Sequence, residues 1–514
     1  MIDTKALREK VLDLAIRGKL VPQDPNDEPA SVLLERIRTE KQQMVKDGKL
    51  KAKDIKNDTI IYKGDDNLHY EKFTDGSVKC IEDEIPFELP EGWEWSRLFS
   101  VSDIVTGSTP SKKNSEYYGG DFPFYKPTDL DQGENVCIAS EYLSDAGKSV
   151  SRIIPKYSTA VCCIGSIGKC GYILKEGTTN QQINTVIPSI ECKYTYYYCC
   201  SDFFVNQLLV ESSATTISII NKSKMSNLLV PIPPIQEQER IATKLDELIS
   251  FVNNIESDKT TLQDLIKQTK SKILNLAIRG KLVPQDLNDE PASVLIERIR
   301  AEKEELIKQG KIKRDKKESV IFKGEDNSYY EKIGSDVCCI DEELPFEVPN
   351  SWAFVRLKEI WELISGRDLS PSEYNASENG IPYITGASNF INGSVELVRW
   401  TPSPQVITEY GDLLLTCKGT IGEMAINDFG SAHIARQIMA IRNHYNLNTE
   451  YLLLCLKFHI DNIKSVAKGL IPGISREDIL NLIIPLPPQE YQVKIVLRTK
   501  EIERMLSEIE KSLS

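Results

Sequence analysis

The stretch LAIRGKLVPQD occupies residues 14–24 of this chain and recurs unchanged at residues 276–286. An unbroken match of eleven residues within one chain indicates an internal duplication. Further matching pairs are NDEPASVL at Asn26 and Asn288, KGDDN at Lys63 with KGEDN at Lys323, IPFELPEGWEWSRL at Ile85 with LPFEVPNSWAFVRL at Leu344, and PIPPIQEQERI at Pro231 with PLPPQEYQVKI at Pro485. The 514-residue chain is therefore predicted to contain two copies of one unit.

The centre of the chain, residues 237–280, has the spacing of a coiled coil. Steps of four and three residues connect the seam positions Ile241, Leu245, Leu248, Val252, Ile255, Lys259, Leu262, Ile266, Thr269, Ile273 and Leu276. The polar residues Lys259 and Thr269 interrupt an otherwise apolar seam, as positions that fix helix register often do. This pattern predicts one long helix.

The two ends of the chain resemble the two ends of that helix. Residues 495–513 show the same four-three steps, and the N-terminal segment finishes in the repeated stretch. Alignment of the copies matches Ser514 with Thr260 and Met1 with Gln263, so the terminal pieces together correspond to the central helix. We expect both pieces to pack antiparallel along the central helix, because half a seam is poorly stable alone.

Each copy of the repeated stretch is followed by a second helical segment and a polar linker. The helical segments end before Gly48 and Gly310, and the linkers contain the strand-like pieces TIIYKG and SVIFKG. The predicted segments are an N-terminal conserved helix segment (residues 1–24), a helical insert and linker (25–84), a first globular domain (85–235), a central coiled-coil helix (236–286), a second helical insert and linker (287–343), a second globular domain (344–488) and a C-terminal conserved helix segment (489–514).

The composition is that of a soluble globular protein, with a net charge of −13. This charge argues against a protein that coats nucleic acid by bulk charge, but DNA binding needs only a local basic face. No apolar run approaches the roughly 18 residues that span a bilayer, and no signal-peptide core is present. The 12 cysteines contain no C-x-x-C pair. We therefore expect a cytoplasmic protein with reduced thiols.

The sequence contains no recognisable catalytic constellation. Its proline pairs, IPPI at Ile232 and LPPQ at Leu486, lack the preceding polar residue and following aromatic with which adenine methyltransferases hold a flipped base. No phosphate-binding G-x-x-x-x-G-K-[ST] loop occurs, and the four histidines show no metal or nucleophile–base spacing. The chain is predicted to bind no metal or cofactor and not to be an enzyme.

Several motifs occur in a familiar order: GSTPSKKNSEYYGGDFPFYKPTDL from Gly107, GSIGKCGYILKEGTTNQQINTVIP from Gly165, PIPPIQEQERI from Pro231, and GKLVPQ. They resemble the specificity subunit of type I restriction–modification enzymes over nearly the whole chain. The second domain departs from the pattern at GRDLSPSEYN, IARQI and PPQEYQ. The resemblance implies an α+β fold with two α/β target-recognition domains, related by internal pseudo-twofold symmetry and separated by long antiparallel coiled-coil helices.

The resemblance also implies function and partners. Each target-recognition domain is expected to read half of a bipartite site in double-stranded DNA. The expected protein partners are two methyltransferase (M) subunits and, in the full complex, restriction (R) subunits, with no membrane. S-adenosylmethionine then belongs to the methyltransferase, and ATP and Mg to the restriction subunit. Two alternatives stay open: a specificity chain of a related assembly that is not type I, and a coiled-coil scaffold that binds protein. A stand-alone enzyme has the least support.

Side chains suited to phosphates and base edges occur at matching places in the two domains. In the first domain the candidate DNA-binding residues are Thr106, Ser108, Thr109, Ser111, Lys112, Lys113, Tyr117, Tyr118, Lys126, Lys169, Asn180, Gln181 and Gln182. In the second they are Arg367, Thr385, Ser388, Asn389, Lys418, Arg436 and Gln437. An alternative for the Asn-Gln-Gln run is a buried amide network, and the recurrence of Gln182 as Gln437 favours a framework role there.

Overall fold

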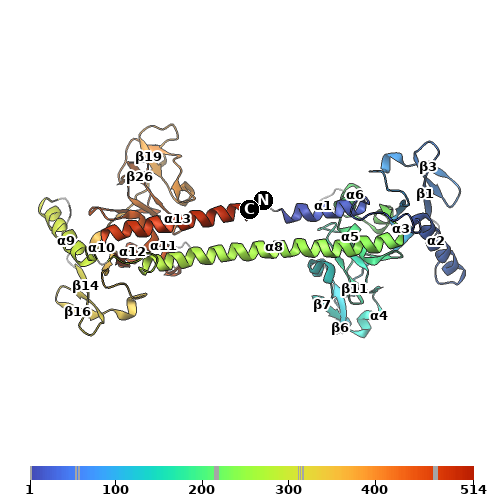
Figure 1. Cartoon of the computed structure of the whole chain (residues 1–514), viewed down its shortest axis with the longest axis horizontal. Helices are drawn as coiled ribbons and strands as arrows, with labels where there is room; N and C mark the ends of the chain where they lie inside the picture. Colours follow the sequence, from blue (N-terminus) through green and yellow to red (C-terminus); the bar gives the residue numbers. More distant parts are fainter. Residues whose placement is uncertain are drawn as a thin grey trace. The chain divides into compact units, whose positions relative to one another are not determined.

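The computed structural model describes residues 3–51, 55, 58–212, 219–286, 288–310, 312, 314, 318–466 and 473–513. The chain divides into two compact units, residues 2–260 and residues 261–514. Each unit combines a mixed helix-and-sheet domain, a smaller insert and part of the long helix α8 (Ile235–Ile278), which is labelled in Figure 1. The fold is α+β with two domains, as predicted.

In the first unit, helix α1 (Thr4–Ile16) lies antiparallel along the first part of α8 (Figure 1). Nη2 of Arg8 donates to Oδ1 of Asn253 at 2.7 Å. Farther along the chain, Nε2 of Gln23 donates to Oε1 of Glu237 at 3.2 Å. Residue numbers thus rise on one partner as they fall on the other, which confirms the predicted antiparallel packing.

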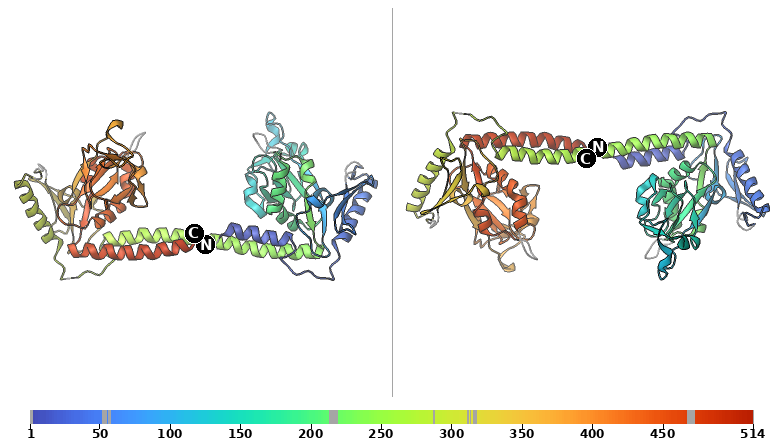
Figure 2. Two further views of the ribbon diagram at one scale, coloured as in Figure 1. Left: turned by 90° about the horizontal axis from the view of Figure 1, so that it is seen from above. Right: turned by 90° about the horizontal axis from the view of Figure 1, so that it is seen from below.

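In the second unit, helix α13 (Gln489–Leu513) lies antiparallel along the later part of α8. Nζ of Lys270 on α8 lies 2.6 Å from Oε2 of Glu510 near the end of α13. At the start of α13, Nζ of Lys494 lies 3.2 Å from Oδ2 of Asp289, beyond the end of α8. Figure 2 shows, within each unit, the mixed domain lying on one side of such a helix pair.

The seam predicted for α8 is buried near the ends of the helix and at Ile266, but it is exposed at Leu262 and Thr269. Ile241 and Leu245 are at most 1% exposed, and Ile273 is 7% exposed. Leu262, by contrast, is 38% exposed, and Thr269 is also exposed. Leu262 is exposed because it lies between the stretch of α8 that packs against α1 and the stretch that packs against α13. The seam is therefore two short seams on one helix.

The repeated stretch LAIRGKLVPQD forms the turn that ends each conserved helix. In the first copy, the backbone N–H of Lys19 donates to the carbonyl of Leu14 at 2.8 Å, and Gly18 has a φ of 65°. Glycine adopts this left-handed conformation without steric cost. A Cβ on Gly18 would lie 2.4 Å from Cγ of Pro90. The turn therefore fits closely against the segment that leads into the first mixed domain.

The second copy makes the same turn with equivalent partners. The backbone N–H of Lys281 donates to the carbonyl of Leu276 at 2.9 Å, and Gly280 has a φ of 67°. A Cβ on Gly280 would lie 2.7 Å from Cγ of Pro349. Nε2 of Gln285 donates to the carbonyl of Gly280 at 2.9 Å. The stretch is identical in the two copies because both perform one local task against matching surfaces.

Each insert contains a helix and a three-stranded antiparallel sheet. The first comprises α2 (Ala30–Lys46), β1 (Thr59–Lys63), β2 (His69–Phe73) and β3 (Val78–Cys80). The second comprises α9 (Ala292–Lys308), β14 (Ser319–Lys323), β15 (Tyr329–Ile333) and β16 (Asp336–Cys339). Both helices end before a glycine with positive φ, as predicted. Where described, the predicted linkers are organised sheets with the orders β1-β2-β3 and β14-β15-β16.

An arginine–glutamate pair fixes each insert to its mixed domain. Nη2 of Arg97 on β4 (Glu94–Arg97) lies 2.7 Å from Oε2 of Glu71 on β2. In the second unit, Nη2 of Arg356 on β17 (Ala353–Arg356) lies 2.6 Å from Oε2 of Glu331 on β15. None of these four side chains is more than 12% exposed. Each pair thus joins two segments that are separate in sequence.

Replacing Glu331 with Gln is expected to destabilise the second unit by about 2 kcal/mol at neutral pH. The cost is smaller than for a buried charge that has lost every partner, because Glu343 still pairs with Arg356. The hydrogen bond from Arg356 holds the pKa of Glu331 below its ordinary value. A carboxyl with a depressed folded-state pKa stabilises above its unfolded pKa and loses this effect as pH falls through the folded pKa. Urea unfolding at several pH values measures the difference, which must shrink in acid. Glu325→Gln, at an exposed turn, is the control.

The first mixed domain contains two four-stranded sheets. Their strand orders are β10-β9-β12-β5 and β7-β6-β11-β8. The strands are β5 (Ser102–Thr106), β6 (Tyr118–Tyr125), β7 (Glu141–Leu143), β8 (Ile153–Ile154), β9 (Thr159–Cys162), β10 (Cys170–Tyr172), β11 (Gly177–Thr179) and β12 (Ile183–Pro188). The helices are α3 (Leu98–Val101), α4 (Asp145–Ser149), α5 (Cys192–Cys200), α6 (Asp202–Glu211) and α7 (Lys222–Ser226), and β13 (Leu229–Ile232) pairs with β4.

The second mixed domain repeats this topology with the orders β18-β27-β24-β25 and β22-β19-β26-β23. Its strands are β18 (Glu362–Ser365), β19 (Ile381–Ile384), β22 (Trp400–Thr401), β23 (Ile407–Thr408), β24 (Leu413–Thr416), β25 (Met424–Ile426), β26 (Ala432–Ile434) and β27 (Ile438–Arg442), with an extra hairpin of β20 (Phe390–Ile391) and β21 (Ser394–Val395). The helices are α10 (Leu357–Ile360), α11 (Thr449–Val466) and α12 (Arg476–Leu480), and β28 (Ile483–Leu486) pairs with β17.

Candidate nucleic-acid interface

Four loops of the first mixed domain meet at one edge of its two sheets. Strands β6 and β11 run parallel and end together, with Tyr125 beside Thr179. Strands β5 and β9 both end beside the start of β12. The loops that leave these strand ends, called here the first edge, are residues 107–114, 126–128, 163–169 and 180–182. The topology thus brings together candidates that are far apart in sequence.

A close backbone approach joins the first and last of these loops. The backbone N–H of Ser108 donates to the carbonyl of Thr179 at 2.9 Å. A Cβ on Gly107 would lie 2.2 Å from the carbonyl oxygen of Asn180, so only glycine permits the contact. Outside this contact, the hydroxyl of Thr109 donates to Oε1 of Gln181. Thr109 and Gln181 are both exposed and form a polar pair that spans the two loops.

Other candidates at the first edge fall into an exposed set and a supporting set. Ser111, Lys112 and Lys113 are exposed, and these two lysines form no ion pair with a described residue. Nζ of Lys126 lies 2.7 Å from Oε2 of Glu141, and Nζ of Lys169 lies 2.7 Å from Oδ1 of Asp131. Of the four candidate lysines, the two without an ion pair to a described residue therefore both lie in the loop that follows β5.

The supporting set holds the loops in place. Nδ2 of Asn180, a residue only 8% exposed, donates to Oε1 of Gln182 at 2.9 Å. Oγ1 of Thr106 donates to Oδ1 of Asn184 at 2.7 Å, and the hydroxyl of Tyr118 donates to the carbonyl of Pro110 at 2.6 Å. The half-buried Tyr117 accepts a backbone hydrogen bond from Ser144 at 3.0 Å. These polar groups are already engaged within the protein.

The second mixed domain builds an equivalent edge, called here the second edge, from residues 366–370, 385–389, 417–422 and 435–437. The backbone N–H of Arg367 donates to the carbonyl of Ile434 at 2.9 Å. A Cβ on Gly366 would lie 2.1 Å from the carbonyl oxygen of Ala435. Nε of Arg436 lies 2.7 Å from Oδ2 of Asp368. This ion pair occupies the position of the Thr109–Gln181 pair in the first domain.

The remaining candidates of the second edge also divide by exposure. Ser388, Lys418 and Gln437 are exposed, as is Arg367. Asn389 is only 2% exposed, and its Oδ1 accepts hydrogen bonds from the backbone N–H and the hydroxyl of Thr385 at 3.0 and 3.1 Å. In this conformation of the loop, the Asn389 amide stabilises a turn and has no free polar group at the surface.

Comparison with known proteins finds one family model that matches two segments of the chain. The family model described as "Type I restriction modification DNA specificity domain" matches residues 90–264 and 349–514. These two ranges include both strand-end edges and cover more than half of the chain. The chain belongs to the type I restriction modification DNA specificity family. It is a non-catalytic DNA-recognition subunit, as predicted.

Relatives of this specificity subunit match it over most of their length. The specificity subunit of the type I restriction enzyme EcoAI from Escherichia coli is 27% identical, with 97% of this chain and 88% of the relative covered. That of EcoEI, also from Escherichia coli, is 26% identical, with 99% and 90% covered. The solved HsdS subunit from Thermoanaerobacter tengcongensis has a TM-score of 0.51 at 20% identity, covering 84% of this chain and 93% of that one. This structural likeness confirms the fold.

Sequence reasoning missed three residues that shape the edges of the specificity subunit. Nη1 of the exposed Arg152 donates to the carbonyl of Thr106 at 2.8 Å and adds a cation to the first edge. The buried His433 donates from Nε2 to the carbonyl of Arg367 at 2.8 Å. Nη1 of Arg476 donates to the hydroxyl of Ser365 at 2.7 Å. No local motif marks these positions, because each acts on a residue 46 or more positions away in the chain.

No described helix is long and apolar enough to cross a bilayer. Within the same ranges, no group of three or more histidine, cysteine, aspartate or glutamate side chains is arranged to hold a metal ion.

Proposed function

We propose that each strand-end edge reads one half of a bipartite site in double-stranded DNA. The supporting observation is a common frame with different outward groups. Gly107 and Gly366 make the same close backbone approach in the two domains. On that frame one edge presents Thr109 with Gln181, and the other presents Asp368 with Arg436. Two domains that share one backbone frame but present different side chains are expected to recognise two different base sequences.

The exposed candidates carry the proposed contacts to DNA. At the first edge these are Thr109, Ser111, Lys112, Lys113, Gln181 and Arg152, with the half-buried Ser108 beside them and with Lys126 and Lys169 available once DNA competes for their carboxylate partners. At the second edge they are Arg367, Ser388, Lys418, Arg436 and Gln437. The other candidates are assigned to the frame, because their polar groups form hydrogen bonds within the protein or their side chains are partly covered. They are Thr106, Tyr117, Tyr118, Asn180, Gln182, Thr385 and Asn389.

The assembly proposed around this chain supplies the chemistry. Two methyltransferase subunits dock on its two equivalent halves, and restriction subunits join the full complex. S-adenosylmethionine is then bound by the methyltransferase, and ATP and Mg by the restriction subunit, whereas this chain binds none of them. The close repetition of LAIRGKLVPQD and of the helical segment that follows it, against the divergence of the edges, supports two copies of one partner.

Replacing Arg436 with Ala is expected to weaken binding of the cognate duplex by ~1–3 kcal/mol and to relax the second half-site only. A guanidinium held by a carboxylate can donate two hydrogen bonds to guanine, so one base position should lose its preference. Competition binding with duplexes that vary one base at a time measures both effects. Lys332→Ala removes an equal charge from the second insert and should change neither. Equal weakening on all duplexes would assign Arg436 to phosphate instead.

The proposed function is tested with the complex of this chain and its methyltransferase partner. The complex is incubated with a library of duplexes containing two random half-sites and spacers of several lengths, and the methylated products are sequenced. One bipartite motif should emerge. Methylation without sequence preference, or no methylation by a complex that forms, would contradict DNA reading and favour a scaffold that binds protein.

A further inference from the structure

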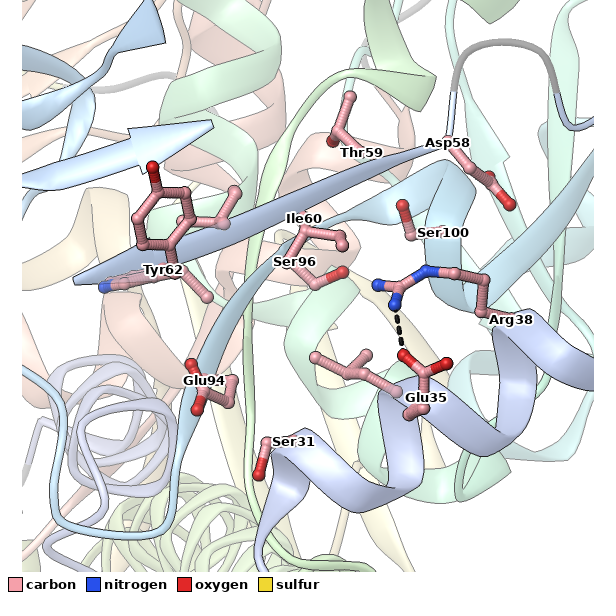
Figure 3. A pocket seen from close by; sticks show the side chains of 13 residues that line it. Ser31, Glu35, Arg38, Asp58, Thr59, Ile60, Tyr62, Glu94, Ser96 and Ser100 are labelled. Atoms are coloured by element: carbon pink, nitrogen blue, oxygen red, sulfur yellow. Dashed lines mark hydrogen bonds and ion pairs between the residues drawn. The ribbon is translucent and has the colours of Figure 1, made fainter. Parts of the chain in front are cut away.

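The hollow beside helix α2 in the first insert contains charges that are paired within the chain. Figure 3 shows Glu35 and Arg38 of α2 joined by an ion pair, beside the strand that carries Ile60. Just before that strand, Oδ1 of Asp58 lies 3.7 Å from Nζ of Lys41. These charges already have partners. A different feature, a pair of thiols in the first mixed domain, has chemistry that neither the fold nor DNA reading uses.

Two cysteines of the first mixed domain hold their sulfur atoms close together. Cys170 begins β10, Cys200 ends α5, and their Sγ atoms lie 3.0 Å apart. Both residues are half-buried, so a small molecule in solution can reach them. The S–S bond of a disulfide is about 2.05 Å long, so the two sulfurs need to approach by only about 1 Å to form one. The pair is therefore placed to form a covalent bond between two elements.

The second mixed domain repeats both elements without the thiols. In the register of β25 with β24, Met424 takes the place that Cys170 has in the register of β10 with β9. The counterpart of Cys200 is Lys457, because each lies six residues after a tyrosine whose hydroxyl donates to a proline carbonyl, in β13 or in β28. One copy of the fold thus forms without either thiol, so the fold does not require the pair in the other copy.

The two sulfurs have different parts in a reaction with a small disulfide. The hydrogen bond with Cys200, together with burial, raises the pKa of the Cys170 thiol. Cys170 therefore stays protonated in the resting pair. Because the thiolate is the attacking form in thiol–disulfide exchange, the first attack falls to Cys200. Cys170 then closes the bond from its position beside Cys200.

A bond between these sulfurs would join the first edge to an anchored helix. Cys170 directly follows Lys169, the last residue of the loop 163–169 of the first edge. Helix α5 is held on α8 by Lys193, whose Nζ lies 2.8 Å from Oδ1 of Asp246. If Cys170 is drawn toward α5 by about 1 Å, the backbone of Lys169 moves with it. The crosslink would therefore displace a loop to which DNA contacts are assigned.

We propose that Cys170 and Cys200 are a redox modification site, which a low-molecular-weight disulfide such as oxidised glutathione converts into an intrachain disulfide. The Cys200 thiolate attacks one sulfur of the small disulfide, whose S–S bond breaks and releases one thiolate. Cys170 then loses its proton, and its sulfur attacks the Cys200 sulfur and displaces the second thiolate. The released thiolates take up the two protons, so two cysteines are oxidised while the small disulfide is reduced to two thiols.

The crosslink is tested by treating the full chain with oxidised glutathione, blocking the remaining thiols and mapping the peptides by mass. The peptides that contain Cys170 and Cys200 should be joined, with the loss of two hydrogen atoms. The Cys170→Ser chain should stop at a mixed disulfide on Cys200. The matched control is Cys80→Ser, at an exposed thiol of the first insert, which should crosslink as the wild type does. A wild-type chain in which both thiols stay free, or which stops at mixed disulfides, would overturn the proposal.

The effect on reading is measured with the crosslinked chain, freed of glutathione and assembled with its methyltransferase partner. This effect rests on the proposed function, whereas the crosslink does not. Selectivity for the first half-site should fall by about tenfold and return on reduction, and selectivity for the second should not change. The Cys200→Ser chain, treated alike, should lose no selectivity. Equal selectivity of the crosslinked and reduced chains would overturn the effect on reading. A reduced chain without any selectivity would contradict the proposed function and leave the crosslink supported by its mass.

Discussion

Replacing residues 85–235 with the first domain of another specificity subunit should change the first half of the methylated site completely and leave the second half unchanged. The two mixed domains belong to separate compact units, and each edge is built from the loops of its own domain. Because the described residues of each edge belong to one unit, the half-sites are expected to respond independently. Sequencing of methylated adenines in cells that carry the exchanged chain gives the result directly.

The boundaries of this exchange follow from the packing. Strand β4 and its partner β13 both lie inside residues 85–235, so the transplant carries their pairing intact. Several contacts cross the boundary, among them Arg97 with Glu71 at 2.7 Å and Nε1 of Trp93 with Oε2 of Glu237 at 3.0 Å. The donor domain must supply Arg and Trp at these places. Without them, a buried carboxylate is left unpaired at a cost of several kcal/mol.

The reciprocal exchange of residues 344–488 is the control. It should change the second half-site and leave the first. If either exchange altered both halves, the domains would not read independently, and the bipartite proposal would be wrong.

Replacing Gly107 with Ala should abolish recognition of the first half-site and leave the second domain folded and selective. The new Cβ would lie 2.2 and 2.3 Å from the carbonyl oxygens of Asn180 and Thr179, both backbone atoms that cannot move aside cheaply. Overpacking of this kind costs about 1–3 kcal/mol, and here the loop that follows β5 must separate from the loop before β12. The Thr109–Gln181 pair would then be lost. Methylation of duplexes with one altered half-site at a time separates the two effects.

Two matched variants make this result specific. Gly366→Ala introduces the same clash at 2.1 Å in the second domain and should abolish only the second half-site. Gly473→Ala, beside Lys418, places its Cβ no nearer than 3.8 Å to another atom and should be neutral. A Gly107→Ala chain that keeps full selectivity would show that the close approach of the loops is not needed for reading.

Much of the fold was predictable because it depends on short-range patterns. Heptad spacing indicated α8, and antiparallel packing of the termini followed from the order of the repeat. The sequence did not indicate how far α1 and α13 extend along α8. Leu262 was therefore predicted in a buried seam, whereas the structure leaves it exposed. The segments around β1 and β14 were predicted as linkers, because five-residue strands acquire a sheet only through partners farther along the chain.

The sequence indicated which residues could belong to the candidate site, but it indicated the role of only some of them. The motif residues near Gly107 and Gln182 were identified, yet a sequence cannot show that the amide of Asn389 is turned inward at 2% exposure. No sequence pattern marked Arg152 or His433. Arg152 donates a hydrogen bond to the carbonyl of Thr106, and His433 donates one to the carbonyl of Arg367, and both contacts depend on the tertiary structure.

By itself, the sequence determined that this chain is a duplication, that its two copies meet in one long helix, and that LAIRGKLVPQD ends that helix. Those features depend on periodicity and on a glycine turn closed within a few residues. Only the tertiary structure decided which outward groups face each other, Thr109 with Gln181 and Asp368 with Arg436. These pairs join residues 72 and 68 positions apart. They meet because antiparallel pairing of β5 with β12, and of β18 with β27, brings the end of one strand beside the start of the other.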